Sequence, residues 1–177
     1  DVITITVNDN AEADVTASDL STLGGKTAGV VTVSNAVDIS GTASELTAAL
    51  VTADTLVVAG TATANITDEA TTDIDATVLS AIGAKTSGAI TVTNAIDIAG
   101  TADEVTAALV TDDTLVVAST ATVTISDNPS ISALNAIAAK TGGVVTATLA
   151  ADSLSNLGAL TTAGTDVITI TVNDGAT

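Results

Sequence analysis

The stretch DVITITVND occupies residues 1–9 and recurs unchanged at residues 166–174. Between these copies, DTLVVA occurs at residues 54–59 and again at 113–118. The pattern therefore restarts at residues 1, 54, 113 and 166, at intervals of 53, 59 and 53 residues. Such recurrence indicates a repeat architecture, and we expect the chain to be a window on a longer array. We predict one repeat domain over residues 1–177, with units at 1–53, 54–112 and 113–165 and a shortened unit at 166–177.

The repeated stretch alternates apolar and polar residues, as a strand with one covered and one wet face does. Ile3, Ile5 and Val7 fall on one face, and Thr4 and Thr6 fall on the other. The Thr-x-Thr pattern or a close variant returns at 32, 63, 91, 122, 146 and 169, at intervals of 23 to 31 residues. Each recurrence is expected to be one coil of about 27 residues.

Short amphipathic segments lie between the expected strands. The first type begins with a capping box, at Thr42 to Glu45 and again at Thr101 to Glu104. The second type contains LSTL at residues 20–23, LSAI at 79–82 and LNAI at 134–137. A stop pattern of Lys-Thr followed closely by Gly ends each segment of the second type. We therefore predict short helices at both types of segment.

Strand, turn, short helix and turn in each coil predict a repeat solenoid of β/α coils. Its strands are expected to form one long parallel sheet, with the short helices on the other side. The threonine face would then meet water. An all-β helix is the alternative, because isolated helices of this length are marginal.

The composition argues against an enzyme. The chain has no His, Cys, Met, Phe, Tyr or Trp, so the usual zinc ligands and covalent nucleophiles are missing. A carboxylate pair such as Asp73 and Asp75 lacks aromatic platforms for sugars. A net charge of −18, from 21 acidic residues against 3 basic ones, would repel nucleic acid and anionic lipid. No run of about 20 apolar residues is present, so no membrane span is expected.

Aspartates recur at the ends of the Thr-bearing strands, and they suggest a cation site. Stacked carboxylates repel one another unless a cation neutralises them, and Ca²⁺ prefers carboxylate and carbonyl oxygens. The alternative is that these residues are turn formers and helix caps. No other cofactor is expected. The predicted Ca²⁺ ligands are Asp9, Asp68, Asp127 and Asp174.

The threonine ranks suggest a second ligand. Ordered Thr-x-Thr ranks on a flat sheet resemble the surfaces by which several unrelated ice-binding proteins hold ice-like water. Against this, threonine is simply a favourable residue for the wet face of a strand, and the ranks drift to Ser34 and Asn65. The predicted ice-binding face comprises Thr4, Thr6, Thr91, Thr93, Thr122, Thr124, Thr169 and Thr171.

The loop around Lys26 resembles the end of a phosphate-binding loop, but the signature fails. It requires a glycine five residues before the Gly-Lys pair, and that position is Leu20. The equivalent loops at Lys85 and Lys140 also lose glycines of the motif. We therefore interpret the three lysines as charges near helix ends.

The wording of the repeats, as in ISDNPSISALNAIAAKTGGVVTA at residues 125–147, resembles the β-strand repeats of very large secreted surface proteins of cyanobacteria and other aquatic bacteria. The resemblance covers almost the whole chain and carries no catalytic residue. It implies an extracellular or cell-surface structural role, as in adhesins, surface layers or filaments.

A structural role of this kind needs surfaces that join successive segments. Exposed strand edges demand further repeats or another subunit. We expect head-to-tail self-association, with the strand at 166–174 offering its edge to the strand at 1–9 of a neighbour. The predicted assembly edges are Val2, Ile3, Ile5 and Val7 at one end, and Val167, Ile168, Ile170 and Val172 at the other.

Overall fold

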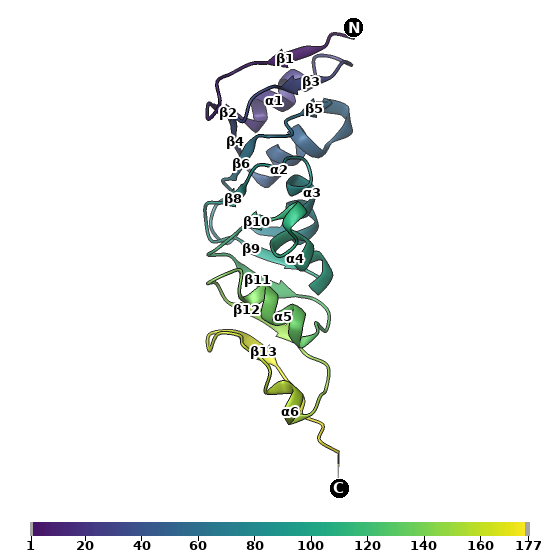
Figure 1. The fold of residues 1–177 in the computed structure, drawn as a ribbon, viewed down its shortest axis with the longest axis vertical. Helices are drawn as coiled ribbons and strands as arrows, with labels where there is room; N and C mark the ends of the chain where they lie inside the picture. Colours follow the sequence, from purple (N-terminus) through teal and green to yellow (C-terminus); the bar gives the residue numbers. More distant parts are fainter. Residues whose placement is uncertain (1, 176–177) are drawn as a thin grey trace.

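The computed structural model describes residues 2–175, which form an elongated stack of α/β coils (Figure 1). The first part contains β1 (Ile5–Val7), β2 (Asp14–Thr16), α1 (Ala17–Gly24), β3 (Val31–Val33), β4 (Asp38–Gly41), α2 (Ala43–Leu46) and the π-helix η1 (Thr47–Val51). The middle part contains η2 (Ala53–Thr55), β5 (Val57–Val58), β6 (Thr63–Ile66), β7 (Asp73–Asp75), α3 (Ala76–Gly83), β8 (Ile90–Val92), β9 (Asp97–Gly100) and α4 (Ala102–Leu109). The last part contains η3 (Asp112–Thr114), β10 (Val116–Val117), β11 (Thr122–Ile125), α5 (Ile131–Ala138), β12 (Val145–Thr148), α6 (Leu154–Leu157) and β13 (Val167–Thr169).

The strands within the described residues form three parallel sheets. The first has the order β1-β3-β5, the second β10-β8-β6-β4-β2, and the third β13-β12-β11-β9-β7. The prediction of a β/α solenoid with one long parallel sheet is therefore wrong. The all-β alternative is also wrong, because residues 2–175 contain six α-helices between the strands.

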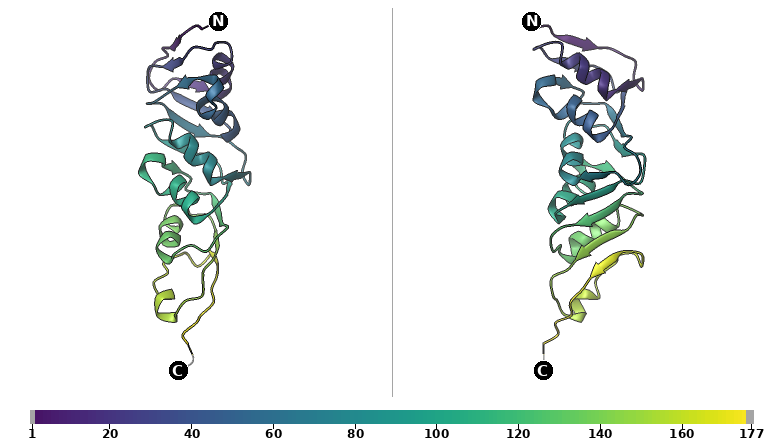
Figure 2. Two further views of the ribbon diagram at one scale, coloured as in Figure 1. Left: turned by 90° about the vertical axis from the view of Figure 1, so that its right-hand side faces the viewer. Right: turned by 180° about the vertical axis from the view of Figure 1, so that it is seen from behind.

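The difference arises because most coils contribute two short strands where the sequence pattern indicated one. β3 and β4, for example, are separated by a corner at residues 34–37 and lie in different sheets. β6 pairs with β4 on one edge and with β8 on the other. All three of these strands belong to the second sheet, whereas β3 and β5 belong to the first, so the chain alternates between neighbouring sheets along the stack, which Figure 2 shows from two further sides.

The pairing of the strands repeats after 59 residues. β2 pairs with β4, with Asp14 opposite Asp38, and β7 pairs with β9, with Asp73 opposite Asp97. β2 and β7 are the first strands of the second and third sheets in chain order. A new sheet thus begins at equivalent points of successive units.

The helices follow one side of the stack, and successive helices contact one another from α1 to α5 (Figure 2). Leu46, Leu79, Val105 and Leu134 on these helices are completely buried. They pack into one continuous aliphatic core with strand residues such as Ile98. Burial of each such side chain contributes about 1.5–3 kcal/mol, so an aliphatic core without aromatic residues still stabilises the fold.

The helix starts predicted from capping boxes are confirmed. The Thr42 hydroxyl accepts the N–H of Glu45, and the Glu45 carboxylate accepts the N–H of Thr42 at 2.8 Å. Thr101 and Glu104 form the same reciprocal pair at the start of α4. Both boxes satisfy backbone donors that have no partner within their helix.

Candidate functional site

Three of the four predicted calcium ligands cap helices of a preceding coil. In each case the aspartate follows a strand, and the donor is the first residue of a helix, whose N–H lacks a partner inside the helix. A carboxylate at this position also interacts favourably with the helix dipole. The carboxylates of Asp68, Asp127 and Asp174 accept the N–H groups of Ala43, Ala102 and Leu154 at 2.6, 2.8 and 2.7 Å, respectively.

The fourth predicted ligand, Asp9, is exposed, and its backbone carbonyl accepts a hydrogen bond from the Asn35 side chain at 2.6 Å. Asn94 makes the equivalent bond to the carbonyl of Asp68 at 2.7 Å. Within residues 2–175, no group of three or more Asp, Glu, His or Cys side chains is placed to hold a metal ion. The Ca²⁺ site stays a prediction, and the aspartates have a visible role as links between coils.

The structure brings together two other carboxylate pairs, which sequence reasoning did not single out. Asp14 lies opposite Asp38 on β2 and β4, and Asp73 lies opposite Asp97 on β7 and β9. The hydroxyl groups of Thr63 and Thr122, on the next strand of each sheet, donate to Asp38 and Asp97. The periodic recurrence of Asp in the sequence was a signal for these pairs. Which aspartates lie opposite one another depends on the register of strands that were not predicted.

The predicted ice-binding threonines do not form one rank. Thr6 lies opposite Thr32 in the first sheet, and Thr91 lies opposite Asn65 in the second. The third sheet holds Thr122, Thr124 and Thr169, while Thr4, Thr93 and Thr171 lie outside the strands. Thr91 and Thr122 are half-buried, whereas the other six are exposed. Ice binding therefore stays a prediction, on a surface that is divided among three sheets.

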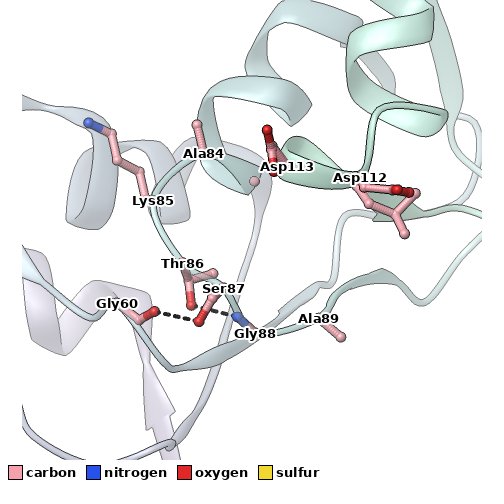
Figure 3. A pocket seen from close by; sticks show the side chains of 11 residues that line it. Gly60, Ala84, Lys85, Thr86, Ser87, Gly88, Ala89, Asp112 and Asp113 are labelled. Atoms are coloured by element: carbon pink, nitrogen blue, oxygen red, sulfur yellow. Dashed lines mark hydrogen bonds between the residues drawn. The ribbon is translucent and has the colours of Figure 1, made fainter.

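The loop after α3 lines a pocket of about 610 Å³ between the end of that helix and η3 (Figure 3). Ser87 donates its backbone N–H to the carbonyl of Gly60 at 3.0 Å, and Gly88 donates its own to the Thr86 hydroxyl at 3.0 Å. The Lys85 side chain extends away from Asp112 (Figure 3). Because these two amides are already bonded, the loop does not form the cradle of free N–H groups that binds phosphate.

This loop is one of three equivalent clamps that join successive coils. In each, a threonine hydroxyl donates to a backbone carbonyl of the preceding coil and accepts the N–H of a glycine two residues later. An added Cβ would meet that neighbouring backbone: at Gly88 it would lie 2.1 Å from the carbonyl oxygen of Ala62. The Lys-Thr-x-Gly pattern is therefore structural. The threonines are Thr27, Thr86 and Thr141, and their acceptors are Ile3, Ala62 and Ala121.

The predicted assembly edges lie at the two ends of the stack (Figure 1). Among the described residues, β1 pairs with β3 alone, and β13 pairs with β12 alone. Ile5, Val7 and Ile168 are half-buried against the core. The exposed fractions of the other five are 80% for Val2, 55% for Ile3, 56% for Val167, 41% for Ile170 and 52% for Val172.

None of the helices in residues 2–175 combines the length and apolar character needed to cross a membrane. No family, curated protein or solved structure matches the chain.

Proposed function

We propose that the chain is a structural segment of an extracellular or cell-surface protein that associates head to tail into rods, layers or filaments. The observation that carries the proposal is the placement of two copies of one nine-residue stretch at opposite ends of the stack, where they contain β1 and β13. Each is paired on one edge among the described residues, through β3 at one end and β12 at the other. An unpaired strand edge is a template for pairing with another chain.

Two further features support this role. The 59-residue periodicity of the strand pairing means that added units can extend the stack without a new kind of contact. The acidic repeat sequences of this chain resemble those of large secreted surface proteins. The net charge of −18 keeps separate copies apart at low ionic strength, so association is expected to strengthen as salt screens that repulsion.

Sedimentation velocity over a series of protein concentrations tests the proposal. We expect species at multiples of the 17.0 kDa monomer mass, with frictional ratios that rise with size because the particles lengthen. The same series at about 0.02 M and 1 M salt should shift toward larger species at the higher value, since the Debye length falls from tens of ångströms to about 3 Å. A monomer at every concentration and in both salts contradicts the proposal.

A further inference from the structure

The repeated nine-residue stretch uses opposite edges of its backbone at its two places in the chain. At residues 1–9, the odd-numbered residues face the following coil. Ile5 donates its N–H to the carbonyl of Val30 at 3.0 Å, and Val7 accepts the N–H of Ser34 at 3.0 Å. Backbone groups of successive residues in a strand point to alternate edges, so Thr4, Thr6 and Asn8 face the outer edge.

At residues 166–174, the even positions of the same motif face the preceding coil. The carbonyls of Thr169 and Thr171, the fourth and sixth residues, accept the N–H groups of Leu149 and Asp152 at 3.0 and 3.1 Å. Asn173, the eighth residue, donates its N–H to the carbonyl of Asp152 at 2.8 Å. The backbone bonds between strands thus use complementary positions in the two copies, the fifth and seventh residues in the first and the fourth, sixth and eighth in the second.

β6 shows that one strand can use both edges at once. Toward the preceding strand β4, Thr63 and Thr67 donate their N–H groups to the carbonyls of Val37 and Gly41 at 3.0 and 2.9 Å. Toward the following strand β8, Ala64 donates its N–H to the carbonyl of Ala89 at 2.9 Å, and Ile66 accepts the N–H of Thr93 at 3.1 Å. By analogy with β6, a single copy of the nine-residue stretch can pair with one coil on each of its two edges.

We propose that residues 1–9 of a second copy replace residues 166–174 on β12 and α6, so that copies join by strand replacement. The inference deepens the proposed self-association and rests on it. The occupant is a second copy because its strand has the identical nine residues. Its Thr4, Thr6 and Asn8 reproduce the bonds to Leu149 and Asp152, and its Asp9 takes the place of Asp174 as the cap of α6.

The stretch at 166–174 buries little apolar surface, which favours its displacement. Val167, Ile170 and Val172 are each at least 41% exposed. Ile168 is the apolar residue of this stretch that packs against the core, and it does so while half-buried. Segments with few buried apolar contacts open at small free-energy cost. Replacement exchanges equal contacts at β12 and α6, and it leaves the incoming strand bonded to its own β3.

Disulfide trapping tests the exchange, because the chain has no cysteine of its own. The acceptor is the chain lacking residues 166–177 and carrying Thr148→Cys. The donor is the full chain carrying Thr4→Cys. Thr148 lies opposite Thr169 in the register of β12 and β13, and Thr169 is the counterpart of Thr4. Mixing the two under mild oxidation should give a disulfide-linked heterodimer as the main product.

The matched control donor adds Asn8→Pro. Asn8 is the counterpart of Asn173, whose N–H donates to the carbonyl of Asp152 at 2.8 Å, so proline removes a donor needed for replacement. The change leaves the backbone bonds of Ile5 and Val7 to the following coil in place. Cross-linking should fall at least about tenfold. If the shortened acceptor does not fold, a full-length acceptor with Thr148→Cys and Asn173→Pro serves instead, since the second change removes the same bond from its own stretch at 166–174. Heterodimer yields that are equal with and without Asn8→Pro, or no heterodimer with a folded acceptor, overturn the inference.

The two proposals fail in different ways. If the intact chain forms multimers in sedimentation but the folded acceptor does not cross-link to the donor, self-association stands and strand replacement is wrong. If the donor and acceptor cross-link while the intact chain stays monomeric at every concentration, strand replacement stands and the proposed assembly is wrong.

Discussion

The central coils and the coil at residues 149–175 contain the same types of aliphatic residue, yet the two regions differ sharply in how far these side chains are buried. In the central coils Leu79, Ile98 and Leu134 are completely buried. In residues 149–175 only Leu149 and Leu157 are buried, and Leu154 is 64% exposed. A coil buries its aliphatic face against coils on both sides, whereas the coil at 149–175 has a described neighbour on one side. Stability in this fold therefore comes from stacking rather than from the composition of any single coil.

Truncation of one leucine in each region should give the largest difference in the free energy of unfolding between the two regions. Leu79→Ala leaves a cavity in the core and should lower the free energy of unfolding by about 3–4 kcal/mol. Leu154→Ala removes an exposed side chain and should cost less than about 0.5 kcal/mol. Urea unfolding followed by circular dichroism measures both. Equal losses would mean that the coil at 149–175 is as well packed as the centre.

Substitution of one glycine in each region tests the same difference in packing, and the expected difference in stability is smaller. In Gly88→Ala, the new Cβ meets the carbonyl oxygen of Ala62 at 2.1 Å, so the clamp between two coils must open. We expect a loss of about 2–3 kcal/mol. Gly164→Ala is the matched control in the coil at 149–175, because nothing lies within 4 Å of its added Cβ. Thermal unfolding should show a clear fall in Tm for the first variant alone, and a similar fall for both would refute the clamp.

Sequence reasoning found the elements whose signals are local. The capping boxes of Thr42 and Thr101 were predicted correctly, because a cap depends on residues three positions apart. The helical segments at 79–82 and 134–137 also lie within α3 and α5. The division into three sheets was not predictable from this pattern. β7, for example, is three residues long, with Ile74 as its one apolar residue between Asp73 and Asp75, so its alternation is too short to mark a strand.

The roles of the candidate site residues depended on contacts distant in sequence. The spacing of Asp68 and Asp127 showed that they recur, but their acceptance of N–H groups 25 residues earlier follows from the stacking of coils. Likewise, Thr86 was read as part of a helix stop, whereas its hydroxyl bridges two coils. The sequence held one signal for this bridge between coils, the fixed spacing of Thr and Gly in each repeat.

Removal of an aspartate that caps a helix should give a still smaller difference in stability between the two regions. Asp68→Ala leaves the N–H of Ala43 without its acceptor in a half-buried site, and a loss of about 1 kcal/mol is expected. Asp174→Ala removes the equivalent bond to Leu154 in an exposed site, where water replaces it, and the loss should be smaller. Urea midpoints compare the two variants. A larger loss for Asp174→Ala would show that the coil at 149–175 contributes more to global stability than its burial indicates.

The pH dependence of the helix starts gives the smallest contrast. The backbone N–H of Thr42, and then its hydroxyl, bond to the Glu45 carboxylate and lower its pKa from 4.5. At the corresponding position of α6 stands Asn156, which does not titrate. A carboxylate whose pKa is lower in the folded state stabilises that state above the unfolded pKa, and the contribution is lost as pH falls through the folded pKa. The urea midpoint of the native chain should therefore exceed that of Glu45→Gln near pH 7, and the gap should close below pH 4.5. A gap that persists at lower pH would show that Glu45 acts through packing and not through its charge.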